Sequence, residues 1–346
     1  MKKIKMKRLT YIFGILIISG LIVLQSCEQN NGKPTKVRSI GSTSEILVVL
    51  QNDELKDGKL GDVLREYLAR EQYGLMQSEP IFDLAFITVG NFSDMFHKHR
   101  NLLIIEFDNQ TLETKVEAMT DRWSSPQRVI KITSPSVAVF AKDFPNYSDG
   151  ILDDYSDAER KRILTVFRPS SKNKVTTAVA EKFNLNMTIP AGFFMAKSEP
   201  GFMWIRKEVS EHSQGIVIIS EPYLDKAQFS KSSVVARSNR ELLQYVPGPS
   251  EGSYMQITSE FIEPSWKQVD GIETDYAVEV RGVWDVVNDF MGGPFVSYTF
   301  VDQNNENIIT IMGYVYRPNK DKRNLLRQME AIIYSVKQRP VKEIKE

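Results

Sequence analysis

From residue 45 onward, the first half of the chain alternates short apolar runs with amphipathic segments. Glu45–Leu50, Ile81–Val89 and Leu102–Phe107 are brief and largely apolar, which is typical of buried strands. Gly58–Glu71 carries apolar side chains at helical spacing, and Phe92–His99 is predicted to form a short helix.

The next segment continues this alternation. We expect a helix over Leu112–Trp123 and strands over Gln127–Ile132 and Val137–Phe140. Because strands and helices alternate but the strands are brief, residues 45–148 are predicted to form an α+β domain with helices on one sheet face.

Residues 149–184 are charged and helical in pattern. Pro169 interrupts them, because proline lacks an amide donor and clashes with the preceding turn. We therefore expect a helical connector in two pieces. Its charge run, which includes Asp153 and Asp154, is most simply a solvated helix face.

The second half is rich in strand patterns and ends in an amphipathic helix over Asn319–Lys337. Asn304-Asn305 is predicted to be a hairpin turn. The expected strands are Met187–Ile189, Gly192–Lys197, Met203–Glu208, Gly215–Ser220, Tyr254–Glu260, Asp275–Val280, Phe295–Asp302 and Ile308–Arg317.

The predicted fold class is therefore α+β, with two α/β sandwich-type domains whose sheets are mainly antiparallel, joined by the helical connector. The second domain spans residues 185–338, and residues 339–346 form a tail.

The first 26 residues have the layout of a secretory signal peptide. A basic stretch precedes Tyr11–Leu24, an uncharged run of fourteen residues. A transmembrane helix needs about 20 apolar residues, so this run is short for a permanent span. Leu24-Gln25-Ser26-Cys27 follows and resembles a bacterial lipobox, although Gln25 replaces the commoner small residue.

We therefore expect lipidation of Cys27, with residues 27–44 as a flexible tether. The alternative is a signal anchor over residues 9–24 with Cys27 as an ordinary buried thiol.

Charge and cysteine content narrow the function classes. The net charge is zero, but residues 1–26 hold five basic and no acidic side chains, which leaves 39 basic against 44 acidic residues. An acidic excess argues against nucleic acid as a partner. Cys27 is the single cysteine, so the chain forms no internal disulfide and no cysteine metal cluster, and we expect no cofactor.

Two motifs that suggest catalysis or metal binding fail on their context. Gly248–Gly252 has the Gly-x-Ser-x-Gly spelling of a hydrolase nucleophile elbow, but prolines interrupt the required strand and the last histidine, His212, precedes the serine. We expect a turn there. His97 and His99 lack an obvious third metal ligand, and we expect a surface helix end.

Met291-Gly-Gly-Pro-Phe295 is the most unusual string. It follows a predicted helical segment, Val283–Phe290, in which Asp285 and Asp289 are spaced one turn apart. The simpler interpretation is a helix C-cap and a turn. The alternative is a nest of exposed amides that holds an anion or polar ligand. Its candidate ligand-binding residues are Trp284, Asp285, Asp289, Gly292 and Gly293.

Aromatic side chains cluster in the second half, among them Trp204, Trp284 and Tyr314. Most are expected in the core. Some could line a groove that binds glycan or peptide, and the sequence does not decide between these roles.

Taken together, several strings resemble one uncharacterised domain-of-unknown-function family of envelope lipoproteins from Bacteroidetes. The Met-Gly-Gly-Pro-Phe string is its most specific part, and the resemblance implies an envelope lipoprotein without implying an activity. The C-terminal half is also similar to the PsbP-like α/β/α sandwich. The other strings include Gln77-Ser-Glu-Pro80, Met203-Trp-Ile-Arg206, Tyr245-Val-Pro-Gly-Pro249, Arg281-Gly-Val-Trp284 and Gly313-Tyr-Val-Tyr316.

Two functional hypotheses follow. The first is a non-enzymatic, lipid-anchored envelope protein that binds or scaffolds an envelope protein or glycan partner, in the outer membrane facing the periplasm. The second is a cell-envelope hydrolase that acts on glycan or peptide through carboxylates near Asp285 and Asp289.

Overall fold

The computed structural model describes residues 36–270, 274, 276–304 and 306–339, and residues from Arg38 onward form one compact unit. The predicted signal peptide and Cys27 lie outside the described residues. So do most of the expected tether, Asn305 of the predicted hairpin turn, and the tail beyond residue 339. No helix within the described part is long and apolar enough to cross a membrane.

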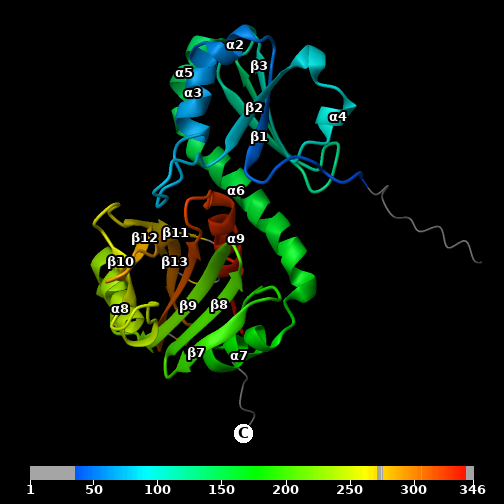
Figure 1. Ribbon diagram of the computed structural model, residues 1–346. Coiled ribbons are helices and arrows are strands. Elements are labelled where there is room, and N and C mark those ends of the chain that lie inside the picture. Colours follow the sequence, from blue (N-terminus) through cyan, green and yellow to red (C-terminus); the bar gives the residue numbers. More distant parts are fainter. Residues whose placement is uncertain (1–35, 271–273, 275, 305, 340–346) are drawn as a thin grey trace, which may run out of the picture. The chain divides into compact units, whose positions relative to one another are not determined.

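The N-terminal half is built on a five-stranded sheet of order β2-β1-β3-β5-β4 (Figure 1). Three of its pairings are parallel, and β4 joins β5 antiparallel. The strands are β1 (Glu45–Leu50), β2 (Asp83–Thr88), β3 (Asn101–Phe107), β4 (Lys115–Thr120) and β5 (Arg128–Ser134).

The α+β class is confirmed, but the expectation of a mainly antiparallel sheet is wrong for this half. Parallel neighbours need a crossover connection. The segment between β1 and β2 supplies one, since it contains α3 (Lys59–Leu68), and the segment between β2 and β3 contains α4 (Asp94–His97).

The predicted type of secondary structure is wrong for two elements. The expected helix over Leu112–Trp123 is the edge strand β4, and the expected strand over Val137–Phe140 is the helix α5 (Val137–Asp143). In β4 the apolar Val116 and Met119 pack on opposite sheet faces, and their three-residue spacing mimics a helix. Ser136 begins α5, because its hydroxyl accepts a hydrogen bond from the Val139 amide at 3.3 Å.

The helices α3, α5 and α6 (Pro145–Phe167) pack on one face of this sheet, around residues such as Leu64, Phe140 and Tyr155, but the expectation of helices on one face alone is wrong, because Phe96 of α4 packs on the other. Phe92, Phe96 and Trp123 cover the other face.

The connector has two main helices, α6 and α7 (Lys174–Phe183), separated by the short 3-10 helix η3 (Arg168–Ser170) that contains Pro169. The expectation that its charges are simply solvated is wrong in part. Glu159 is fully buried and accepts hydrogen bonds from Asn101 at 2.8 Å and Arg162 at 2.9 Å.

The C-terminal half is built on an antiparallel sheet of order β10-β12-β13-β14-β9-β8-β7, with β11 also paired to β12. The strands are β7 (Phe194–Glu199), β8 (Phe202–Val209), β9 (His212–Pro222), β10 (Tyr254–Thr258), β11 (Ser265–Val269), β12 (Ala277–Val287), β13 (Gly292–Val301) and β14 (Asn307–Tyr316). A small separate sheet pairs β6 (Leu185–Asn186) with β15 (Lys337–Gln338).

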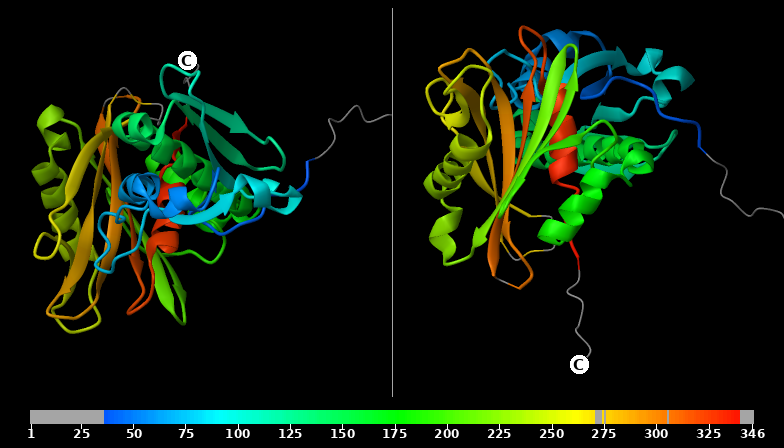
Figure 2. Two further views of the ribbon diagram at one scale, coloured as in Figure 1. Left: turned by 90° about the horizontal axis from the view of Figure 1, so that it is seen from above. Right: turned by 60° about the horizontal axis from the view of Figure 1, so that its bottom comes forward.

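Helices cover both faces of the large sheet. Figure 2 shows α8 (Lys231–Tyr245) and α9 (Arg323–Ile333) on its opposite sides. The α8 face includes Trp204, Phe295 and Met312, and α7 and α9 enclose the other face with residues such as Ile311. The α8 helix has no counterpart in the sequence-based expectation.

Two expectations for this half are corrected. Met187–Ile189 is not a strand, and Val283–Phe290 is not a helix. Val283–Val287 completes β12, whose pairing with β10 and β13 satisfies its backbone. Side chains along β12 therefore alternate between the two faces, which decides what each candidate residue can reach.

Candidate functional site

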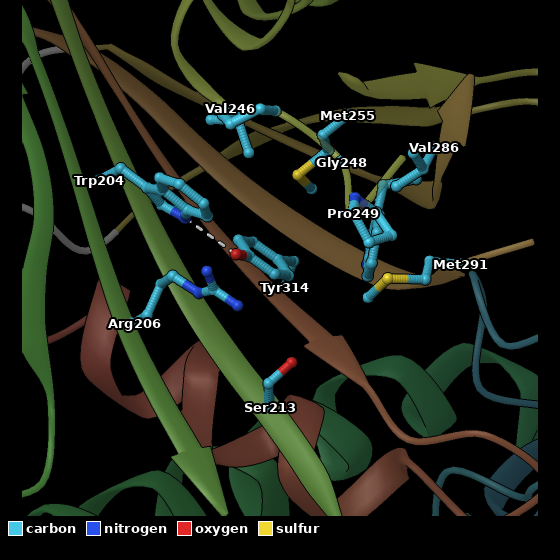
Figure 3. A pocket seen from close by; sticks show the side chains of 12 residues that line it. Trp204, Arg206, Ser213, Val246, Gly248, Pro249, Met255, Val286, Met291 and Tyr314 are labelled. Atoms are coloured by element: carbon cyan, nitrogen blue, oxygen red, sulfur yellow. Dashed lines mark hydrogen bonds between the residues drawn. The ribbon is translucent and has the colours of Figure 1, made fainter. Parts of the chain in front are cut away.

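A pocket of about 310 Å³ lies on the α8 face of the large sheet. The α8 helix ends at Tyr245, and the loop that follows, residues 246–253, forms part of the pocket wall. We call this cavity the aromatic pocket (Figure 3). It is lined by Trp204, Arg206, Ser213, Val246, Pro247, Gly248, Pro249, Met255, Trp284, Val286, Met291 and Tyr314.

Three buried aromatic side chains line the pocket on its sheet side. The Trp204 indole N–H donates to the Tyr314 hydroxyl oxygen at 2.9 Å, as Figure 3 shows. The Trp284 ring meets the Tyr314 ring edge-on with centroids 5.2 Å apart, and its indole donates to the Val315 carbonyl at 3.2 Å. These contacts hold the rings in fixed orientations, so this side of the pocket is pre-formed.

Glycines on β9 and β13, the two strands that flank β14, make room for these rings. Gly215 pairs with Tyr314 across β9 and β14, and a Cβ at Gly215 would lie 2.1 Å from the tyrosine ring. Gly293 pairs with Trp284, and a Cβ there would lie 2.1 Å from the Val315 carbonyl oxygen and 3.3 Å from the Trp284 indole nitrogen.

One side of the pocket is polar. Arg206 places its guanidinium carbon 4.8 Å from the Trp204 ring centroid and forms an ion pair with Glu208. Ser213 lies near it in Figure 3, whereas Met255 and Met291 lie across the pocket. Among the described residues that line the pocket, Arg206 is the only charged one.

The Tyr314 hydroxyl is a hydrogen-bond donor held at the centre of the pocket. Burial raises the pKa of this phenol, although the Trp204 hydrogen bond and the Arg206 charge oppose the rise. The hydroxyl is therefore neutral near pH 7 and keeps its proton. It accepts from Trp204, and its own O–H meets no acceptor within the part of the chain that is described.

Of the five residues that the sequence grouped as a candidate site, four line a second hollow of about 430 Å³, namely Trp284, Asp285, Asp289 and Gly292, and Gly293 does not line it. Trp284 and Gly293 are cross-strand partners on the aromatic-pocket side of the sheet, and Gly292 pairs with Asp285. Asp285 follows Trp284 directly in β12, so its side chain points to the opposite face.

Asp285 and Asp289 do not share a helix face. Asp289 lies in the turn after β12, where it accepts hydrogen bonds from the Ser250 hydroxyl and the Phe290 amide, each at 2.7 Å. These two bonds lower the pKa of the Asp289 carboxyl. Asp285 and Asp289 both line the hollow of about 430 Å³, and the Asp285 Oδ1 atom has no hydrogen-bond partner among the described groups.

The two interpretations of Met291–Phe295 shared a premise that is wrong, since no helix precedes the glycines. Residues 288–291 form the turn of the β12–β13 hairpin, and the positive φ falls at Asn288, not at Gly292 or Gly293. The glycines serve close packing in β13 and not a left-handed conformation.

The remaining candidate motifs have structural roles. Ser250 lies in a turn, as expected, and its hydroxyl donates to Asp289. His97 stacks on Trp123 with centroids 4.8 Å apart. His99 is buried instead of ending a surface helix, and its Nε2 lies 2.7 Å from a Glu45 carboxylate oxygen.

Sequence reasoning placed Trp204 and Tyr314 in the general aromatic cluster and quoted Trp204, Arg206 and Tyr314 within strings of the family resemblance, but it did not name any of the three as a candidate site residue. A weak signal is present, because β8 alternates Phe202, Trp204 and Arg206 on one face, so a charge follows two buried aromatic residues. The strand register that places Gly215 of β9 against Tyr314 of β14 cannot be predicted from a local pattern in the sequence.

Comparisons with known proteins identify families but no activity. Residues 171–335 match the family model described as Domain of unknown function (DUF4837), and residues 39–168 match Domain of unknown function (DUF8532). No curated protein matches the chain.

Two solved structures show distant similarity. LpqN, described as involved in cell envelope biogenesis of Mycobacterium tuberculosis, is 14% identical with a TM-score of 0.28, over 45% of this chain and 83% of that one. Clostridium butyricum Argonaute, bound to a guide DNA and a 19-mer target DNA, is 8% identical with a TM-score of 0.16, over 87% of this chain and 46% of that one. The comparisons therefore show two consecutive segments that each match a family of unknown function. Pro169 and Ser170 of η3 lie between the two segments.

Proposed function

We propose that this chain is a lipid-anchored cell-envelope protein that binds a small apolar ligand, without catalysis, in the aromatic pocket. The observation that carries the proposal is the pocket itself: pre-formed buried rings, mostly apolar walls and a few polar groups on one side. This combination is typical of small-molecule sites, and about 310 Å³ lies at the small end of their size range.

The size and lining also indicate the scale of the ligand. A volume of about 310 Å³ corresponds to roughly ten liquid water molecules. That is enough for one ring system or one short acyl chain, and the apolar walls gain free energy by removing such a group from water. A glycan chain would bring many hydroxyl groups that these walls cannot satisfy.

Binding can be tested with the neutral apolar probe N-phenyl-1-naphthylamine, whose fluorescence rises in apolar surroundings. The chain from residue 28 onward is suitable, because every described hydrophobic cluster lies between Ile46 and Val336. We expect the unmodified chain to bind the probe saturably. Met291 lines the pocket from the partly exposed β12–β13 hairpin, so Met291→Trp should fill the pocket and abolish binding. Met291→Ala is the matched control and should retain binding. Absence of saturable binding in the unmodified chain would contradict the proposed function.

The envelope location rests on the N-terminal sequence. The basic stretch, the short apolar run and Cys27 support lipidation, and the resemblance to Bacteroidetes envelope lipoproteins supports the same placement. Glu28 replaces the aspartate that retains lipoproteins in the inner membrane of enteric bacteria, which favours the outer membrane, facing the periplasm.

We expect Cys27→Ala to abolish labelling by a radioactive fatty acid, and globomycin to cause accumulation of the lipidated precursor in cells that carry the unmodified chain. Equal labelling of the Cys27→Ala variant would contradict lipidation at this residue.

The hydrolase alternative is less well supported by the geometry. Asp285 and Asp289 both line the hollow of about 430 Å³, but the Asp289 carboxyl is bonded to the Ser250 hydroxyl and the Phe290 amide, and these hydrogen bonds lower its pKa. A general acid at neutral pH needs a raised carboxyl pKa. We therefore expect Asp289→Asn to leave cellular function intact in a complementation assay. Loss of complementation by a stable Asp289→Asn variant would favour the hydrolase.

A further inference from the structure

We infer that the aromatic pocket selects single-chain amphiphiles with an anionic headgroup, and that Arg206 and Tyr314 recognise the headgroup. This inference rests on the proposed function and names the class of ligand. It is carried by the position of one cation and one unused O–H donor on the same side of an otherwise apolar pocket.

The two donors lie on β8 and β14, which are separated in the sheet by β9. Trp204 connects them, because its ring lies beneath the Arg206 guanidinium and its indole N–H bonds the Tyr314 hydroxyl. The tyrosine hydroxyl accepts that bond, and its O–H is still available to donate to a ligand. A carboxylate accepts hydrogen bonds without donating any, and therefore complements both groups.

The charge of the site favours an anion over a neutral acceptor. Arg206 lies close enough for its charge to oppose the rise in the pKa of Tyr314. Its ion pair with Glu208 uses only part of its capacity, because a guanidinium has five N–H donors. About a third of the Arg206 side chain is exposed (32%), so an incoming headgroup can reach it from solvent.

The rest of the pocket is suited to an apolar tail. Figure 3 shows Met255, Val286 and Met291 on the side away from Arg206 and Ser213. Methionine side chains are flexible and adapt to irregular apolar shapes, so they tolerate a chain and not just one rigid ring. The headgroup would then lie between Arg206 and Tyr314, with the tail against the methionines.

The test is displacement of N-phenyl-1-naphthylamine by decanoate, decanol and decylamine, which share one tail and differ in their headgroups. We expect decanoate to bind about tenfold or more tightly than decanol, since hydrogen bonds to charged groups are the stronger ones. Decylamine should bind most weakly. Arg206→Gln should remove the preference for decanoate, because decanoate affinity should fall about tenfold or more and decanol affinity should fall less.

The matched control is Lys207→Gln. Lys207 is the next residue of β8 and lies on the opposite sheet face, where it contacts Phe193. This variant changes the net charge equally and should keep the preference. Tyr314→Phe should weaken decanoate more than decanol, and a thermal melt establishes that the variant is folded.

The outcomes separate the two proposals. If the neutral probe binds but decanoate and decanol displace it equally, the headgroup inference is wrong and the proposed function stands. The inference also fails if Lys207→Gln and Arg206→Gln have the same effect, because the preference would then reflect net charge alone. If the neutral probe does not bind, both proposals fail.

Discussion

At the scale of single residues, close packing decides which positions tolerate change. Gly293 illustrates this, because its hydrogen atom occupies the space between the Val315 carbonyl and the Trp284 indole. The residue lies in β13 with no positive φ, so its role is to let a neighbouring strand and a large ring approach.

We predict that Gly293→Ala destabilises the fold by about 1–3 kcal/mol, because the added methyl group would meet backbone and not a flexible side chain. Urea unfolding at pH 7 measures the change. The control is Gly90→Ala, where a Cβ would meet no atom within 4 Å. An unchanged unfolding midpoint for Gly293→Ala would show that the strands separate at little cost.

A second glycine should respond in the opposite direction. Gly150 lies inside α6, and a Cβ there would also meet nothing within 4 Å. Alanine is the better helix former, so Gly150→Ala should raise stability by about 1 kcal/mol. A higher thermal midpoint would confirm it, and a lower one would show that α6 needs flexibility at this position.

At the scale of elements, a buried charge cluster joins β12 to α9. Arg281 of β12 donates two hydrogen bonds to Glu279, at 2.6 and 2.7 Å, and forms an ion pair with Glu330 of α9. Burial alone would raise the pKa of Glu279, but the charge and hydrogen bonds of Arg281 outweigh burial and lower it to about 2. The cluster is therefore ionised at neutral pH.

This shift makes stability depend on pH in a defined direction. The ordinary pKa of Glu279 is 4.5, so its contribution is present above pH 4.5 and is lost as the pH falls toward 2. We predict a loss of roughly 3 kcal/mol over that window, measured by urea unfolding at several pH values. Glu279→Gln should be less stable than the unmodified chain at pH 7, and the difference should shrink at pH 2. The exposed Glu117→Gln serves as the control, and a pH-independent effect of Glu279→Gln would contradict the linkage.

At the scale of the whole molecule, a carboxylate of the N-terminal half caps a helix of the C-terminal half. The first turn of α9 has no side-chain cap from its own N-cap residue, Lys322. Glu79 supplies one, since its carboxylate accepts the backbone amides of Lys322 at 2.7 Å and Arg323 at 2.9 Å. Asp83 adds a second link through the Arg323 guanidinium at 2.7 Å.

We predict that Glu79→Ala lowers the free energy of unfolding by about 1–2 kcal/mol, the usual cost of losing a buried helix cap. The amides of Lys322 and Arg323 should also exchange hydrogen faster, which mass spectrometry can follow. Glu66→Ala, an exposed substitution on α3, is the control. Unchanged exchange at both amides would mean that the cap does not stabilise the start of α9.

Local sequence patterns were enough to predict an element where its apolar residues followed one period, either that of a strand or that of a helix. The apolar run of Glu45–Leu50 and the amphipathic stripe of α9 predict their elements because their side chains face one core with one repeat. The edge strand β4 misled the prediction, since a strand with little burial has apolar residues on both faces and no clean alternation.

Some features of the candidate site could likewise be predicted from the sequence, and others could not. The α+β class, the break at Pro169 and the turn at Ser250 could be predicted from the amino-acid sequence, and so could the unusual string that follows Trp284 and contains Gly293. The folded chain was needed to see that Trp284 and Asp285 point to opposite faces of the sheet, and that Arg206 and Tyr314 both contact Trp204. These outcomes depend on the strand register between distant segments of the chain. Trp204 and Tyr314, for example, are 110 residues apart in the sequence. Register is set by which side chains fit against each other across strands, and no local period in the sequence encodes that fit.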